Sequence, residues 1–143
     1  MNISSMSGLD VLQAMASGQV PGPSIANTMP MSLVSAEEGA VVFNAIADDR
    51  HLNPLGGVHG GFAATVLDSV TGCAVHSLLA AGVGYATIDL NIKMIRPLPK
   101  NSTLTAEGKV INLSKLLGVA EGTLKDSNGK LLATATATCM ILS

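Results

Sequence analysis

The residue best placed to do chemistry in this sequence is Asp68, the one carboxylate in a long apolar stretch from Gly60 to about Ala81. An aspartate in apolar surroundings is rarely kept without a partner or a purpose, so Asp68 is a candidate base or nucleophile. The stretch lacks proline and is too long for one strand, which favours a helix buried on most sides.

The loop before this helix supplies a second chemical feature, a set of free backbone N–H groups. Pro54, Gly56 and Gly57 interrupt regular structure, so the helix is expected to begin near Gly60. The first N–H groups of a helix have no partner within it, and the helix dipole adds partial positive charge there. Such a helix start can stabilise negative charge that develops on a substrate oxygen.

The spacing of these two features limits how they can act together. Gly60 and Asp68 are eight residues apart in the sequence, which is about 12 Å along a helix axis. One reacting carbon has to lie about 3 Å from both the attacking group and the oxyanion donor. Two antiparallel copies of the helix satisfy this, with Gly60 from one chain and Asp68 from the other. The site is therefore expected at a two-fold interface and twice per dimer.

The other polar residues suggest no metal centre. Cys73 and Cys139 both lie in apolar runs and are expected to be buried, reduced thiols. The three histidines form no cluster with metal-ligand spacing, so no metal is expected. Thr71, three residues after Asp68, is placed to bond the acid, although a hydroxyl satisfied within the helix is the simpler reading.

The composition favours one domain that forms an oligomer. The chain has 143 residues, 48% of them hydrophobic and only 13% charged, so part of its surface is expected to be buried between subunits. Two Phe, one Tyr and no Trp leave little to stack on bases, which argues against binding single-stranded nucleic acid.

The charge is unevenly distributed along the chain. Residues 1–92 carry seven acids and one base, and residues 93–143 carry seven bases and three acids. The second half can attract an anionic ligand, or its bases can be solvated strand edges. The N-terminus shows no signal-peptide pattern, and the charge of Asp68 makes a membrane span costly. A cytoplasmic location with no membrane partner is therefore expected.

The remaining elements follow from hydrophobic alternation and turn residues. The sequence predicts a helix over 7–18, a loop over 20–29, and strands over 31–37, 40–47, 85–95, 103–113, 116–125 and 130–142. In strand 85–95, the alternation puts one set of residues on one face and another set on the opposite face: Ala86, Ile88, Leu90, Ile92 and Met94 against Thr87, Asp89, Asn91 and Lys93.

Small residues on the last strands predict how helix and sheet meet. Ala133, Ala135, Ala137 and Cys139 share one face, and Ala120 and Gly122 occupy the preceding strand. A face of small residues lets a helix lie close to it. We expect a single α+β domain over 1–143, with 1–30 as an N-terminal helix and loop extension. A five- or six-stranded antiparallel sheet would wrap one long central helix, as in the hotdog fold.

Three segments of this sequence resemble the hotdog acyl-CoA thioesterases of the phenylacetic-acid-degradation (PaaI) type. They are HGGFAATVLDSVTGCAVH, YATIDLNIKMIRPLP and DSNGKLLATATATCMIL, and the resemblance covers roughly residues 30–142. Its most specific part is the order Asn53, His59-Gly60-Gly61 and Asp68.

The resemblance implies roles for the motif residues. Gly60 would give its N–H to the thioester carbonyl, and Asp68 would attack it or activate water. Asn53 would position the substrate or the water, and Thr87 matches a hydroxyl residue that assists the acid. His59 would orient the loop or touch the substrate, or else satisfy a backbone group.

The resemblance also implies an acyl-CoA substrate, with no separate cofactor because coenzyme A is part of that substrate. Such enzymes are usually homodimers or homotetramers built as dimers of dimers. The expected substrate-binding residues are Gly61, Thr71, Lys93, Arg96, Ser114 and Lys115.

Two other functions remain open on the same fold. The first is hydration or dehydration of an acyl thioester, for which His59 is the only candidate catalytic histidine. The second is a non-catalytic acyl-CoA-binding domain. That class normally carries an added DNA-binding segment, and the 30-residue N-terminus is too short and not basic.

Overall fold

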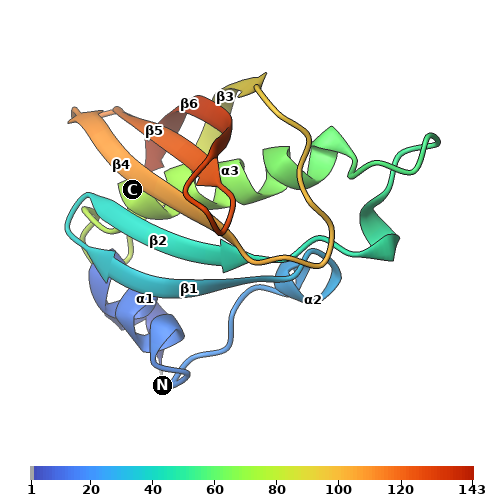
Figure 1. The fold of residues 1–143 in the computed structure, drawn as a ribbon. Helices are drawn as coiled ribbons and strands as arrows, with labels where there is room; N and C mark the ends of the chain where they lie inside the picture. Colours follow the sequence, from blue (N-terminus) through green and yellow to red (C-terminus); the bar gives the residue numbers. More distant parts are fainter. Residues whose placement is uncertain (1) are drawn as a thin grey trace.

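The computed structural model describes residues 2–143, which form a curved antiparallel sheet around one long helix (Figure 1). The six strands lie in the order β1-β2-β4-β5-β6-β3. Their bounds are β1 Met31–Glu37, β2 Ala40–Ala45, β3 Gly84–Met94, β4 Leu104–Leu113, β5 Leu117–Lys125 and β6 Leu131–Leu142. The central helix α3 spans Gly60–His76 and packs against β2, β4, β5, β6 and β3. The expected α+β hotdog fold is confirmed.

Glycines on the sheet let α3 lie unusually close to the strands. A Cβ on Gly108 of β4 would overlap the backbone carbonyl oxygen of Val70, in the middle of α3. A Cβ on Gly122 of β5 would come within 3.1 Å of Thr71 Cγ2 and 3.3 Å of Leu67 Cδ2. The small-residue face expected on the last two strands is therefore the surface that receives the helix.

The apolar face of α3 builds the core with the concave side of the sheet. Fully buried residues recur along the helix at helical spacing, and the alternate residues of β2, β4, β5 and β6 meet them: Phe62, Val66, Leu67, Val70, Ala74, Val75, Val41, Leu104, Ala106, Ala120, Leu124, Ala133 and Cys139. The other face of α3 holds polar and half-buried residues and is not covered by the sheet.

The helix α3 is shorter than expected. It ends at His76 rather than near Ala81, because Ser77 closes the last turn. The Ser77 hydroxyl donates to the Ala74 carbonyl at 2.6 Å and accepts from the Gly39 N–H in the β1–β2 turn at 2.8 Å. The chain then turns through Gly82, whose φ of 80° suits glycine.

Strand β3 lies at one edge of the sheet and pairs only with β6. A β-bulge between Thr87 and Asp89 shifts its register, so the expected simple alternation is wrong. Thr87 before the bulge and Leu90 after it both face inward and are half-buried. Ile88 is 55% exposed on the outside.

An N-terminal segment covers the opposite edge, beside β1. It consists of helix α1 (Gly8–Ala16), a connecting strap over 17–24 and the one-turn helix α2 (Ile25–Thr28). Helix α1 packs against β1, with few contacts to α3. The short helix α2 corrects the expectation of a continuous loop over 20–29; its four residues are too few to show hydrophobic periodicity.

Candidate active site

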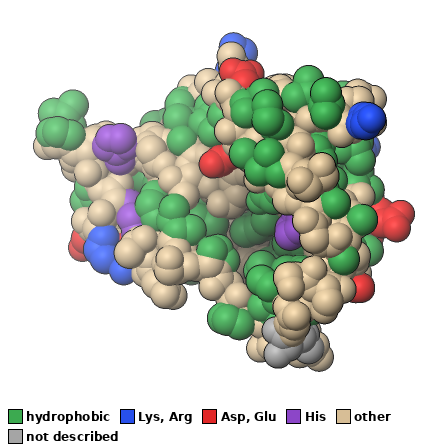
Figure 2. Space-filling model, turned by 180° about the vertical axis from the view of Figure 1, so that it is seen from behind, with side chains coloured by type: hydrophobic (Ala, Val, Ile, Leu, Met, Phe, Trp, Pro, Cys, Tyr) green, Lys and Arg blue, Asp and Glu red, His purple; other side chains and the backbone are tan. Residues whose placement is uncertain are grey.

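A cleft of about 1130 Å³ runs over the outward face of α3. Figure 2 shows this side of the molecule, where hydrophobic side chains surround a hollow. Along α3 the cleft is lined by Thr65, Asp68, Ser69, Cys73 and His76, which share one helical face. Tyr85 and Thr87 of the edge strand β3 line it on one side, and the N-terminal segment lines it on the other. Asp68 is thus in the cleft, on a rigid element.

The Asp68 carboxylate lacks a hydrogen-bond partner within residues 2–143. Its Oδ1 atom is buried, and no protein donor reaches that oxygen. A buried carboxylate oxygen without a donor is costly and is expected to receive one from a substrate, a water or another chain. The structure therefore leaves Asp68 available for chemistry.

The groups around Asp68 are held in their neutral forms. Burial, together with the charge of Asp68, raises the pKa of the Cys73 thiol to about 12. Burial likewise raises the pKa of Tyr85 and of Cys139, and it lowers the pKa of the His76 imidazole. At neutral pH the groups beside Asp68 are thus a neutral phenol and two neutral thiols, and the uncharged imidazole of His76 lies two turns farther along α3.

The first turn of α3 leaves one backbone donor free. His59 is the N-cap, and its Nδ1 accepts a hydrogen bond from the Gly61 N–H at 2.7 Å. The Phe62 N–H donates to the His59 carbonyl at 3.0 Å. The Gly60 N–H has no partner among the described residues, so it is the donor that a substrate oxygen can use.

Asn53 organises the loop that leads into this turn. Its Oδ1 accepts from the N–H groups of Leu55 and Gly57 at 3.0 and 3.1 Å, and its own N–H donates to the Gly57 carbonyl at 2.8 Å. The side-chain carbonyl is thereby used within the loop, and the Nδ2 amide makes no hydrogen bond among the described residues. Leu55 is 97% exposed at the tip of this loop, which projects from the body of the molecule (Figure 1).

Within one chain, the Gly60 donor does not line the cleft that holds Asp68. A Cβ on Gly60 would lie 3.2 Å from Met94 Cε, which places the start of α3 near the far end of β3. His59, Gly61 and Phe62 line a separate hollow, beside His51. The eight-residue separation along α3 is about 12 Å, so the two groups belong to different places of one monomer.

Of the other expected residues, Thr87 lies with Asp68 and Thr71 does not. Thr87 lines the same cleft, with its hydroxyl 3.8 Å from Cys139 Sγ. Thr71 is fully buried on the side facing the sheet, and its hydroxyl donates to the Leu67 carbonyl at 2.7 Å. Thr71 thus has the hydroxyl satisfied within the helix that the simpler reading expects, and it does not line the cleft. Gly61 is occupied by its bond to His59.

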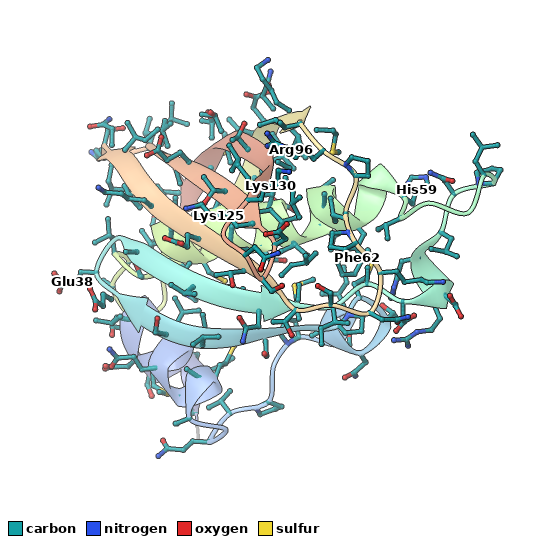
Figure 3. All side chains as sticks on the ribbon, in the orientation of Figure 1. Glu38, His59, Phe62, Arg96, Lys125 and Lys130 are labelled. Atoms are coloured by element: carbon teal, nitrogen blue, oxygen red, sulfur yellow. The ribbon has the colours of Figure 1, made fainter. Side chains whose placement is uncertain are left out.

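The expected substrate-binding residues outside α3 lie in two separate places. Lys93 and Arg96 lie at the end of β3 nearest the start of α3, and Arg96 donates to the Leu131 carbonyl at 2.6 Å. Figure 3 shows Arg96 beside the β5–β6 hairpin that carries Lys125 and Lys130. Ser114 and Lys115 lie in the β4–β5 hairpin, at the opposite end of the sheet. One chain cannot place both sets on the same phosphate group, because the strands between them span about 30 Å.

Among the residues that line the cleft beside Asp68, sequence reasoning gave no role to Thr65, Ser69 or Tyr85, and Ser69 was noted only as lying near the acid. Thr65 and Ser69 share a helical face with Asp68, a signal available from spacing alone. Tyr85 packs its ring against His76, with centroids 5.4 Å apart, and its position depends on how β3 meets α3. Local sequence patterns give no signal for such a long-range contact.

No group of three or more His, Cys, Asp or Glu side chains in residues 2–143 is arranged to hold a metal ion. Both cysteines are free thiols. Over the same residues, each helix is too short or too polar to cross a membrane.

Comparison with known proteins finds one family. The model of the thioesterase superfamily matches residues 55–133. A Halobacterium salinarum protein named as an esterase is 44% identical over 68 residues, or 46% of this chain, and the match spans 44% of that relative's length. Acyl-coenzyme A thioesterase 13 of Homo sapiens is 28% identical over 104 residues, covering 72% of this chain and 74% of the relative.

Solved structures agree with these sequence matches. A phenylacetic acid degradation-related thioesterase structure from Ralstonia eutropha JMP134 superposes with a TM-score of 0.82 at 32% identity, covering 90% of this chain and 98% of the other. A thioesterase structure from Streptococcus pneumoniae, solved with coenzyme A, has a TM-score of 0.75 at 22% identity and covers 82% and 90% of the two chains.

Proposed function

This chain belongs to the thioesterase superfamily, and we therefore propose that it hydrolyses an acyl-CoA thioester to a free acid and coenzyme A. The observation that carries the proposal is Asp68, whose Oδ1 atom is buried in the cleft without a donor. A carboxylate left in this state on a rigid helix is suited to attack a carbonyl carbon or to deprotonate water.

The second half of the site is the free N–H of Gly60, supplied by a partner copy. The carbonyl oxygen of a thioester gains negative charge on attack, and a fixed backbone donor at a helix N-terminus stabilises it without reorganisation. Because Gly60 and Asp68 are about 12 Å apart on one helix, the pair that serves one substrate comes from two antiparallel chains. The unpaired edge of β3, which borders the Asp68 cleft, is the surface through which two copies would pair.

Two chemical routes are open to Asp68, and both conserve atoms and charge. In the first, the carboxylate attacks the thioester carbon, the coenzyme A thiolate leaves and takes a proton, and water cleaves the resulting acyl-aspartate anhydride. In the second, the carboxylate removes a proton from water, and the hydroxide adds to the carbon before the thiolate leaves. Thr87 shares the cleft and can donate to Asp68 or to the water in either route.

The residues at the start of α3 have positioning roles in this proposal. His59 holds Gly61 through its Nδ1, and Asn53 holds the loop through its Oδ1. Lys93 and Arg96 lie at the same end and would attract the coenzyme A phosphates. A relative of the same fold has been solved with coenzyme A, which supports this substrate class.

The geometry disfavours the hydratase alternative. A neutral histidine acts as a base through its unprotonated nitrogen, and in His59 that nitrogen already accepts from the Gly61 N–H. The remaining Nε2–H is a donor only. No other histidine lies in the motif loop: His51 donates to the Thr28 carbonyl at 2.6 Å and accepts from the Asp48 N–H at 3.0 Å.

Release of free thiol from a panel of acyl-CoAs tests the proposal. Hydrolysis of at least one of them, lost in Asp68→Asn, is the expected result. Tight binding without thiol release would instead indicate a binding domain. Addition of water across an enoyl-CoA without thiol release would indicate a hydratase.

A further inference from the structure

The Asp68 cleft has two distinct ends. Asp68 lies toward Thr87 and Cys139, on the side of edge strand β3. The N-terminal segment lies on the side of β1, at the opposite edge of the sheet, where Met15, Ala16 and Val20 line the same cleft. A molecule held at Asp68 by its reacting carbon can therefore extend over α3 toward the N-terminal segment.

The lining between these ends is uncharged. Beyond Asp68, no Lys, Arg, Asp or Glu in residues 2–143 lines the cleft. Met31, Leu33 and Phe43 of β1 and β2 contribute apolar surface on the far side. The Thr65 hydroxyl donates back to the Gly61 carbonyl at 2.9 Å and so offers little to a ligand. A charged group placed here would lose its hydration without gaining a partner.

The N-terminal segment forms the far wall of the cleft, and contacts hold this wall in place at both of its ends. The Gly8 N–H donates to the Leu79 carbonyl at 3.0 Å, and a Cβ on Gly8 would overlap the His76 carbonyl oxygen. At the other end His51 Nε2 donates to the Thr28 carbonyl at 2.6 Å. A wall held by hydrogen bonds at both ends can set a length limit. This wall lies outside residues 55–133, the part matched by the superfamily model.

From this arrangement we propose that the cleft binds an uncharged aliphatic acyl chain, and that Met15 and Ala16 of α1 set its maximum length. The inference rests on the proposed thioesterase function and specifies its substrate class. A helix with its side chains is about 10 to 12 Å wide, and an extended alkyl chain advances about 1.3 Å per carbon. A chain that crosses α3 from Asp68 to α1 therefore has about eight carbons.

The test is a chain-length series with matched variants. The specificity constant kcat/KM is measured from butyryl-CoA to myristoyl-CoA for the wild type, Ala16→Phe and Gln19→Phe. Ala16 lines the cleft, whereas Gln19, three residues on, is exposed and does not line it. In the wild type, kcat/KM should rise up to about four-fold per methylene until octanoyl-CoA and then level off or fall.

Ala16→Phe should lower kcat/KM for octanoyl-CoA and decanoyl-CoA at least ten-fold and change butyryl-CoA less than about three-fold. Gln19→Phe should match the wild type across the series. Met15→Ala, which removes bulk from the same wall, should move the optimum to a longer chain. A terminal carboxylate on the octanoyl chain should reduce kcat/KM at least a hundred-fold, because the lining offers it no cation.

Equal loss at every chain length in Ala16→Phe, or no loss at any, would overturn the inference while leaving the thioesterase function standing. Binding of S-butyl-CoA and S-octyl-CoA thioethers, measured by calorimetry, gives a readout independent of hydrolysis. Ala16→Phe should weaken only the S-octyl ligand, and equal affinity of both proteins for it also contradicts the proposal. If thiol release fails for every acyl-CoA but this selective weakening remains, the thioesterase function is wrong and the chain-binding cleft is right.

Discussion

The Nδ1 atom of His59 accepts a hydrogen bond from the backbone N–H of Gly61 at 2.7 Å, and this bond selects which donor of the helix stays free. With Gly61 occupied and Phe62 bonded to the His59 carbonyl, the Gly60 N–H is the one left for a ligand. His59 therefore determines which backbone N–H at the start of α3 is available to a ligand.

The first prediction concerns this capping bond. His59→Ala should lower the free energy of unfolding by about 1 kcal/mol, the usual cost of losing an N-cap. It should also lower kcat more than it changes KM, because the oxyanion donor is no longer held in place. His59→Asn, which keeps a capping acceptor, should recover most of both. An Asn variant as inactive as the Ala variant, with its stability restored, would show that the imidazole itself takes part in the reaction.

The second prediction concerns the carboxylate. Asp68→Asn should lower turnover at least a hundred-fold, because the amide is neither a base nor a nucleophile. The substitution keeps the size of the side chain, so the thermal unfolding midpoint should not fall. Steady-state thiol release and a melting curve measure the two effects. Turnover above half of the wild-type value would remove Asp68 from the mechanism.

The third prediction tests whether one site uses two chains. Asp68→Asn and Gly60→Pro homodimers should each be nearly inactive, since proline removes the Gly60 N–H. Proline is tolerated in the first turn of a helix, so the variant is expected to fold. Each mixed dimer would hold one intact and one doubly damaged site. Random reassortment makes about half of the dimers mixed, so about a quarter of wild-type activity should return.

The control for this experiment is a mixture in which dimers are shown to have exchanged, for example with differently tagged chains. Folded, mixed dimers that regain nothing would mean that both residues serve one site from a single chain, or that Gly60 is not the donor.

The fourth prediction concerns the close packing of α3 on the sheet. Gly108→Ala should destabilise the fold by about 1 to 3 kcal/mol, because its Cβ overlaps the Val70 carbonyl oxygen. Gly84→Ala is the matched control, since Gly84 also lies in a strand and has no atom within 4 Å of an added Cβ. Denaturant unfolding compares the two. Equal stability of both variants would show that α3 can move away from the sheet at little cost.

Much of this fold could be predicted from local patterns. The alternating residues of β4 and β6 and the apolar run of α3 are strong periodic signals, and the small residues Ala120 and Gly122 indicated where the helix would lie. The bulge at Ile88 could not be predicted, because it depends on how β3 pairs with β6. The end of α3 at Ser77 depends on a contact with Gly39, 38 residues away.

Part of the candidate site could likewise be predicted from local sequence patterns, and part could not. Asp68 could be identified because a carboxylate is unusual in a long apolar helix. The start of the helix at Gly60 could be identified because the proline and glycines before it interrupt regular structure. Tyr85 and the N-terminal wall of the cleft were not, since residues distant in the sequence meet there only after α1 packs against β1. Thr71 is close to Asp68 along α3, but its side chain is buried against the sheet and its hydroxyl donates to the Leu67 carbonyl.

The unpaired edge of β3 has a consequence for handling the protein. Alternate residues of this 11-residue strand point their backbone donors and acceptors away from β6, and no strand within residues 2–143 covers that side. Such an edge is a template for any extended polypeptide. A substitution that blocks pairing of two copies should therefore yield aggregates rather than stable monomers, and dilution should cost the sample both its catalytic turnover and its colloidal stability.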